Sequence, residues 1–398
     1  MNISKYTNLS DETLQTFYSK SNGTLMNMGN TCYINTLIQS LLSLPSFTHF
    51  ILSKDYEDRL NLNKSLEQSS LNLILELRDI FDLMHLQGYS LKPKKFLLIL
   101  SKKFDYLDFH INQQNDLHEI LTLIINQINI EIKFSSENVI QYFNKKILNN
   151  NEQYNDIRSI QINTYKNWYN HHKNEYSELT EMFFGQQISQ IKCGNSDCNY
   201  IHHNYECFIE IFLDLDFITK QQSFNGEKYN YTLTDCIDEI FKPQFLNNNT
   251  DSNSESNSDS NSNKWKCDQC NTKTTSEQVI KFWKLPPILI ISLKRFFYCP
   301  IRHHYMKNNN IIDIPIQLDM TNNVLNTLSQ KKIKYTLQSV ALHYGDINGG
   351  HYIALTRKSL DNNKWTFIDD LESQDLSQKE ALIYMKKYAY ILFYSLDN

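Results

Sequence analysis

The chain has 398 residues, of which 41% are hydrophobic and 13% aromatic, enough apolar material for a large buried core. Its net charge of −5 is scattered along the chain, which argues against a basic nucleic-acid-binding surface. No apolar run approaches the ~20 residues that a membrane-spanning helix needs, and the start MNISKYTNLSDET lacks the regions of a signal peptide. We therefore expect a cytoplasmic or nuclear protein that binds neither nucleic acid nor a membrane.

The first third of the chain is expected to be mostly helical. Residues 1–21 are polar and are expected to form an N-terminal arm. Apolar residues then recur with a helical period from Thr31, a candidate N-cap, to Leu44, and Pro45 is expected to end this helix. Similar patterns predict helices at about 65–87, 91–104 and 114–130.

The middle of the chain is less regular. The segment 134–182 is polar with interleaved Tyr and Trp, and its pattern leaves open whether it is an ordered insertion. Strand-like alternation begins at Phe183. The Asn/Ser run at 247–263 is too polar to form a core and is expected to be a disordered, solvated loop.

The last third consists of short apolar runs bounded by turn residues. These runs are ILIISLKRFFY, YTLQSVALHYGD, HYIALTR, KWTFID and YAYILFYSL. Several strands in succession, without comparable helical patterns between them, indicate a mainly antiparallel sheet. The sequence therefore predicts an α+β fold with helices first and the sheet last.

A reactive cysteine is predicted at the start of the first helix. The free N–H groups and the positive dipole end at a helix start favour a thiolate at Cys32 over a thiol. Asn27, Gly29 and Asn30 precede it in a polar, loop-forming segment, as expected where amides must face a developing oxyanion. The alternative is a buried structural cysteine.

A histidine and a carboxylate can complete this site. His351 follows Gly349 and Gly350, in a chain with only nine glycines, and opens an apolar strand. Asp369 ends the next strand, where its carboxylate could orient the imidazole. Cys32, His351 and Asp369 would then be nucleophile, base and orienting group, although Asp369 alone could equally be a turn residue.

Two cysteine pairs indicate a structural metal site. Cys193 and Cys198 form a C-x4-C motif, and Cys267 and Cys270 form a C-x2-C motif, each pair enclosing turn residues. Four thiolates at these spacings suit a closed tetrahedral Zn²⁺ site. A set of free thiols is the alternative.

These motifs resemble those of the ubiquitin-specific proteases. The stretch GTLMNMGNTCYINTLIQSLLSLP resembles their cysteine box, and LHYGDINGGHYIAL with KWTFIDD resembles their histidine box. Between the boxes, QNDLHEIL and LPPILIISLKRF are also similar to segments of the family. The resemblance runs in order from about Gly23 to Tyr394 and covers nearly the whole chain.

The resemblance implies a papain-like cysteine protease fold of the ubiquitin-specific protease type. A catalytic domain at 22–398 would comprise a helical thumb at about 22–182, zinc-ribbon fingers at about 183–284 and an antiparallel-sheet palm at about 285–398. Cys32, His351 and Asp369 would be catalytic, with Asn27 as the oxyanion-hole amide. The residues implied to face the ubiquitin tail are Asp116, Glu119, His343, Gly349, Gly350 and Tyr352. The family's first zinc knuckle is usually C-x2-C, so the C-x4-C of Cys193 and Cys198 departs from its pattern.

The implied function is thiol-dependent deubiquitination, the hydrolysis of the (iso)peptide bond after the C-terminal glycine of ubiquitin. The partners would be ubiquitin and ubiquitinated proteins, and the enzyme would act as a monomer with one structural Zn²⁺. One alternative is a catalytically inactive ubiquitin-binding module, although such a module would be free to lose the three catalytic side chains. Others are a protease for a ubiquitin-like modifier and a zinc-ribbon nucleic-acid module, the last disfavoured by the charge of −5.

Overall fold

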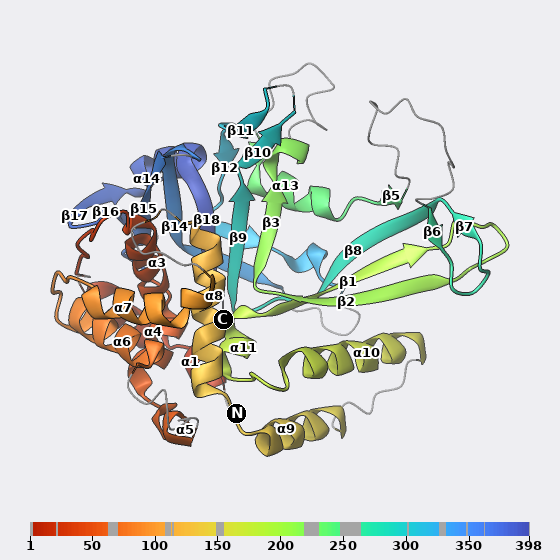
Figure 1. Cartoon of the computed structure of the whole chain (residues 1–398), viewed down its shortest axis with the longest axis horizontal. Coiled ribbons are helices and arrows are strands. Elements are labelled where there is room, and N and C mark those ends of the chain that lie inside the picture. Colours follow the sequence, from red (N-terminus) through yellow and green to blue (C-terminus); the bar gives the residue numbers. More distant parts are fainter. Residues whose placement is uncertain are drawn as a thin grey trace.

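The computed structural model shows a helical part, a large central sheet and a long arm of strands (Figure 1). It describes residues 3–20, 23–62, 71–107, 113, 115–148, 155–218, 231–246, 264–300, 302–325, 332–347, 349–361 and 363–397. The predicted loop at 247–263 lies outside these residues. No helix within these ranges is both long enough and apolar enough to cross a membrane.

The N-terminal part is helical, as predicted. Its helices are α1 Ser4–Thr7, α2 Asp11–Ser19, α3 Cys32–Leu42, α4 Pro45–Ser53, α5 Glu57–Leu62, α6 Leu73–Phe81, α7 Lys94–Lys103 and α8 Leu117–Ile132. The helix expected at 65–87 is α6, extended by a π-helical turn at Asp82–Leu86, and residues 65–70 are outside the described ranges. The polar N-terminal segment contributes α1 and α2, whose Tyr6 and Tyr18 are buried.

Thr31 is the N-cap residue of α3, but its hydroxyl does not cap the helix. The Thr31 Oγ1 instead accepts a hydrogen bond from the Met28 N–H at 2.8 Å, within the preceding loop. The predicted N-cap residue is therefore confirmed, although the loop uses the hydroxyl for its own closure. Pro45 follows the end of α3 and is itself the first residue of α4, where its missing N–H costs nothing.

The segment that the sequence left undecided, 134–182, is mostly helical where it is described. It forms α9 Ser136–Leu148, α10 Asn155–His172 and α11 Glu178–Phe183. Ser177 caps α11 in a reciprocal capping box with Thr180. Trp168 and Tyr176 are buried in the main hydrophobic cluster, so the aromatic residues of this polar segment are its contribution to the core.

The central sheet has eight strands and is mainly antiparallel, as predicted. The strand order is β17-β16-β15-β14-β18-β9-β3, with β13 also paired to β14. The strands are β3 Glu210–Asp214, β9 Ile288–Lys294, β13 Gln317–Asp319, β14 Lys334–Asp346, β15 Gly349–Arg357, β16 Lys364–Asp369, β17 Glu372–Ser377 and β18 Ala389–Leu396. The pair β3–β9 is parallel.

Both faces of the sheet are buried at its inner strands, such as β9. Along β9, Ile288 and Ile290 join the hydrophobic cluster that includes α3, α4, α6 and α8. Leu289 and Ile291 join a second cluster on the other face, with α13 Leu233–Ile240 and α14 Gln378–Tyr388. A strand covered on both faces needs a continuous apolar run, which accounts for the ILII sequence of β9. The helices and sheet together confirm the α+β class.

A four-stranded sheet extends from this body as an arm (Figure 1). Its strand order is β2-β1-β8-β5, from β1 Gly185–Lys192, β2 Ile201–Phe208, β5 Gln244–Leu246 and β8 Ser276–Lys284. The hairpin of β6 Trp265–Lys266 and β7 Lys273–Thr274 lies at its far end. The remaining short strands are β4 Tyr231–Thr232, β10 Phe296–Cys299, β11 His304–Lys307 and β12 Ile312–Asp313.

Candidate active site

Cys32 is the first residue of α3 and is only 2% exposed. The loop before it turns sharply, because Gly29 has a φ of 99° and Asn30 a φ of 56°, both in the left-handed region. The structure thus places Cys32 where free helix N–H groups and the helix dipole favour negative charge. Helix α3 packs against β15, the strand that carries His351.

His351 lies between Cys32 and Asp369. Its Nε2 is 2.6 Å from Asp369 Oδ1, at the end of the neighbouring strand β16. The hydrogen bond with Cys32, aided by that with Asp369, raises the pKa of His351 to about 9 despite partial burial. Since Nε2 faces Asp369, the other ring nitrogen, Nδ1, is left to face Cys32. The three side chains can therefore hold a thiolate–imidazolium pair with an orienting carboxylate.

The side chain of Asn27 is fixed at both ends. Its Oδ1 accepts hydrogen bonds from the N–H groups of Gly29 (3.0 Å) and Thr31 (3.1 Å). Its Nδ2 donates to Asp370 Oδ2 at 2.9 Å. This leaves the second Nδ2 proton available to a further acceptor. These hydrogen bonds hold the Asn27 amide in one orientation, with its remaining N–H donor next to the loop before Cys32.

Strand alternation should send the side chains of Asp369 and Asp370 to opposite faces, but the structure differs. Asp370 lies just beyond β16 with a φ of 51°, so the extended geometry on which alternation depends ends at Asp369. Carboxylate oxygens of both residues lie within 4.8 Å of each other and of a His351 ring nitrogen. Asp370 Oδ1 accepts from Asn35 Nδ2 at 2.7 Å. The two aspartates therefore serve different neighbours in one site.

Three residues expected to face the ubiquitin tail line a cavity of about 490 Å³ next to the site. These are Asp116, the N-cap of α8, together with His343 on β14 and Tyr352 on β15. Asp116 Oδ2 accepts a hydrogen bond from the Tyr390 hydroxyl at 2.7 Å. Burial lowers the pKa of His343 to about 3, so its ring is neutral. Glu119 is exposed on α8 and does not line this cavity.

Gly349 and Gly350 differ in what surrounds them. A Cβ on Gly350 would lie 2.1 Å from His343 Nε2, so a side chain there would displace the buried ring. A Cβ on Gly349 would meet nothing within 4 Å. The turn before them is held by Lys307, whose Nζ donates to the carbonyl oxygens of His343 (2.8 Å) and Gly345 (2.9 Å).

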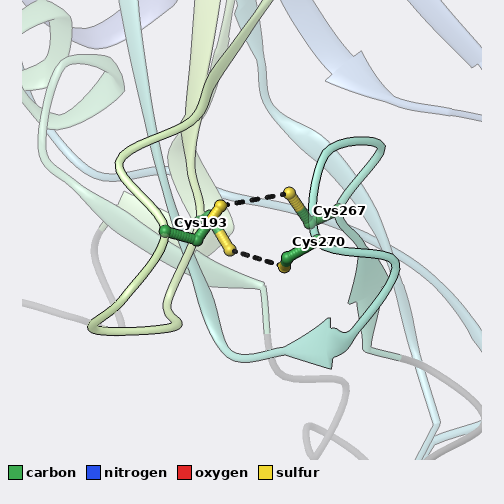
Figure 2. Close-up of side chains that lie close together, drawn as sticks. Cys193, Cys267 and Cys270 are labelled. Atoms are coloured by element: carbon green, nitrogen blue, oxygen red, sulfur yellow. Dashed lines mark hydrogen bonds between the residues drawn. The ribbon is translucent and has the colours of Figure 1, made fainter.

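The four cysteines of the two pairs come together where the arm meets the β6–β7 hairpin. Cys193 Sγ lies 3.8 Å from Cys270 Sγ, and Cys198 Sγ lies 3.8 Å from Cys267 Sγ (Figure 2). All four sulfur atoms are within 4.8 Å of one another. Sulfur ligands about 2.3 Å from a tetrahedral ion are separated by about 3.8 Å, so these donors fit one metal ion. Cys198 takes its place in the cluster despite the longer C-x4-C spacing.

The family model described as "Ubiquitin carboxyl-terminal hydrolase" matches residues 24–394. The chain belongs to this family.

Its curated relatives carry the same family name. It is 25% identical over 393 residues to "Ubiquitin carboxyl-terminal hydrolase 4" of Saccharomyces cerevisiae, a match that covers 93% of this chain and 39% of the relative. The protein of that name from Vanderwaltozyma polyspora is 25% identical over 397 residues, with 93% and 40% covered. The chain thus spans about two-fifths of the length of these relatives.

Solved structures show the same fold. A chain of the SAGA DUB module with Ubp8, Sgf11, Sus1 and Sgf73, bound to monoubiquitin, superposes with a TM-score of 0.66 at 21% identity. The match covers 96% of this chain and 70% of that one. The module bound to ubiquitin aldehyde gives 0.63 at 22% identity, covering 94% and 70%. The helical part, central sheet and arm thus have the arrangement of a ubiquitin-specific protease fold.

Some residues of this site carry little or no signal in the sequence. Asn35 lies one helical turn after Cys32 on a fully buried helix, and a polar residue on so apolar a helix is a usable signal. Lys307 carries no such signal, because its stretch RHHYMK matches no motif and its contact with Gly345 joins segments that are distant in the sequence. Tyr390 reads as one more aromatic residue of an apolar strand.

Proposed function

We propose that this chain is a thiol-dependent deubiquitinating enzyme that hydrolyses the (iso)peptide bond after the C-terminal glycine of ubiquitin. The proposal is supported above all by the alignment of Cys32, His351 and Asp369, with His351 hydrogen-bonded on both sides. A non-catalytic module has no need of this pair of hydrogen bonds. Membership of the ubiquitin carboxyl-terminal hydrolase family supports the same reaction.

In the proposed reaction, His351 holds the Cys32 proton and the thiolate attacks the glycine carbonyl carbon. The resulting oxyanion accepts hydrogen bonds from the Cys32 backbone N–H and from the free Nδ2 proton of Asn27. The His351 imidazolium gives its proton to the departing lysine amine as the C–N bond breaks. Water, deprotonated by His351, then cleaves the thioester and releases the ubiquitin carboxylate and the free thiol.

The ubiquitin tail would reach Cys32 through the cavity lined by Asp116, His343 and Tyr352. A carboxylate and apolar rings along one passage suit an extended peptide with basic side chains. Gly349, with open space around its Cα, would let that peptide pass beside His351. Glu119 would contact the tail from the rim of this passage. Gly350, which has no side chain, would leave the His343 ring in place. Ubiquitin and ubiquitinated proteins are thus the proposed partners, and one copy of the chain supplies all these residues.

We assign the four-cysteine cluster to one structural Zn²⁺. Four thiolates leave no open position for a substrate, so the ion would stabilise the end of the arm without entering the reaction. The eight cysteines, all within the described residues, are free of disulfides. This supports a reducing compartment, the cytoplasm or nucleus, as the site of the proposed activity.

The test is to react the purified protein with ubiquitin carrying a C-terminal electrophile and to map the modified residue. We expect one adduct, on Cys32, and we expect Cys32→Ala to abolish both the adduct and cleavage of a fluorogenic ubiquitin substrate. Cys299→Ala, at a half-buried thiol outside the site, is the matched control and should retain both. Failure of ubiquitin to label Cys32 would overturn the proposal. Labelling by a ubiquitin-like modifier alone would reassign the substrate, and no labelling by either would indicate a binding module.

A further inference from the structure

A second cluster of metal-binding side chains lies outside the active site and the four-cysteine cluster. It consists of His171 and His172, at the end of α10, and Cys207, on β2. One potential ligand atom from each residue lies within 4.8 Å of the other two. Helix α10 runs along the arm and contacts β2, so two segments distant in sequence bring these side chains together (Figure 1).

His172 is the most informative member of the cluster. Its side chain is buried, with the residue 4% exposed, and its Nε2 has no hydrogen-bond partner among the described residues. The ring packs against Trp168 and Phe184, with centroid distances of 4.4 and 4.7 Å, so it cannot turn towards solvent. A buried nitrogen with an unused lone pair or proton destabilises a fold unless something binds it.

Cys207 and His171 face the same place. Within the part of the chain that the structure describes, the hydrogen bond of the Cys207 Sγ is a long one, 3.7 Å to Asn167 Oδ1, which is weak even for a thiol. The ring of His171 lies 4.6 Å from that of His172, and its side chain is exposed and free to adjust.

All three residues line the edge of a cavity of about 970 Å³ between α8 and the arm. The cavity gives a cation a route to the cluster and leaves a fourth coordination position open to water. Lys284, whose charge acts on both His172 and Cys207, is paired with Glu181 at 2.6 Å, which reduces its repulsion of a cation. Ligands of one tetrahedral ion lie about 3.3–3.8 Å apart, so the side chains must close by at most about 1.5 Å.

We propose that His171, His172 and Cys207 form a second binding site for a transition-metal cation, Zn²⁺, that ties the end of α10 to strand β2. Two imidazoles and a thiolate are ligands that Zn²⁺ favours over Mg²⁺ or Ca²⁺. On binding, the Cys207 S–H bond breaks, its proton goes to solvent and the sulfur bonds to the ion, while each histidine binds through the lone pair of a ring nitrogen. The site is independent of the proposed deubiquitinating reaction.

The test is to dialyse the purified protein against Zn²⁺ and count the bound zinc per chain by elemental mass spectrometry. Wild type should bind one equivalent more than either His171→Ala or Cys207→Ser, and His304→Ala, another exposed histidine, should match wild type. Because the His171 side chain is exposed, its variant should fold even if Cys207→Ser does not. Zn²⁺ should also raise the melting temperature of the wild type more than that of His171→Ala.

A second measurement separates the two clusters. With Co²⁺ in place of Zn²⁺, the thiolate-to-metal absorption of the wild type should exceed that of Cys207→Ser by the share of one thiolate. Equal zinc content in wild type, His171→Ala and Cys207→Ser would overturn the proposal, since all bound metal would then belong to the four cysteines. A second equivalent that survives both substitutions would overturn it as well.

Discussion

Asp370 holds the side chain of Asn27 in place, with Asn27 Nδ2 donating to Asp370 Oδ2 at 2.9 Å. The same carboxylate accepts from Asn35, and the Asp370 carbonyl oxygen accepts from the Leu25 N–H at 3.2 Å. Asp370, which follows Asp369 directly after the end of β16, thus joins this strand to the loop before Cys32 and to helix α3. In the proposed mechanism Asp370 is a positioning residue for the oxyanion donor.

The first prediction concerns this positioning. Asp370→Asn keeps the side-chain size and a residue type that accepts a φ of 51°, but it replaces one of two acceptor oxygens by an NH2 group, so the side chain can no longer accept from both Asn27 and Asn35. We expect kcat to fall by about tenfold or more with KM little changed, because an oxyanion donor is worth about 10²- to 10³-fold. Steady-state kinetics on a fluorogenic ubiquitin substrate measures both kcat and KM.

A double-mutant cycle with Asn27→Ala tests the route of the effect. If Asp370 acts through Asn27, adding Asp370→Asn to Asn27→Ala should cost little further activity, so the two losses are not additive. Asp375→Asn, on the exposed strand β17, is the matched control and should have wild-type rates. Fully additive losses would contradict the positioning role.

The second prediction concerns Asp369. Its carboxylate faces His351 Nε2, so Asp369→Ala leaves a base without an orienting partner. We expect kcat to fall by more than about tenfold but by less than in Cys32→Ala, which lacks the nucleophile. A larger loss in Asp370→Ala than in Asp369→Ala, measured on the same substrate, would reverse the assignment of the two aspartates.

The third prediction is a pH dependence set by His351. Its pKa is raised to about 9 by Cys32 and Asp369, above the ordinary value of about 6.5. The folded protein therefore binds the extra proton between these values, so this interaction stabilises the fold fully below about pH 6.5 and is lost as the pH rises through about 9. We expect kcat/KM to fall on the alkaline side near pH 9.

Removing either hydrogen-bond partner of His351, Asp369 or Cys32, should lower the pKa of its imidazole. In Asp369→Asn the alkaline fall should begin at lower pH, and in Cys32→Ala the His351 resonance followed by NMR should titrate at least about one pH unit lower. His304→Ala, at an exposed histidine that is not one of the three catalytic side chains, is the control for histidine substitution. An alkaline limb unmoved by Asp369→Asn would show that another group controls it.

Local patterns in the sequence were enough to predict the helix that begins at Cys32, the α+β class and the antiparallel strands of His351 and Asp369, because each depends on residues close in the chain. Thr31 is the N-cap residue of that helix, as predicted, but the local pattern does not show that its hydroxyl bonds within the preceding loop. Nothing local reveals that the carboxylate of Asp370 meets Asn27, 343 positions away in the chain. Whether the segment that contains α10 is ordered could not be predicted for a similar reason, since its aromatic residues are buried only by tertiary contacts.

The fourth prediction concerns the four-cysteine cluster. If a metal ion joins Cys193, Cys198, Cys267 and Cys270, then Cys267→Ser removes a ligand whose sulfur is fully buried. We expect the melting temperature to fall by more than about 5 °C, because metal binding contributes to folding free energy. Cys299→Ser should melt like the wild type. Equal melting temperatures for the two variants, with and without a chelator, would contradict a structural metal at this cluster.

The last prediction concerns Lys307, which holds the turn before Gly349. Its ammonium donates to the carbonyl oxygens of His343 and Gly345 and contacts His343 Nδ1 at 3.0 Å, while burial lowers its pKa to about 8. Lys307→Met keeps much of the volume but removes all three contacts. Since each hydrogen bond contributes about 1 kcal/mol and only part of that bears on the turn, we expect KM for ubiquitin substrates to rise by about fivefold. The value of kcat should stay near wild type, because Cys32, His351 and Asp369 keep their own contacts.

Lys242→Met removes an exposed lysine of the α13 end and should change neither parameter. A fall in kcat with KM unchanged would mean that Lys307 acts on the reacting groups, and not on the turn that borders the substrate passage.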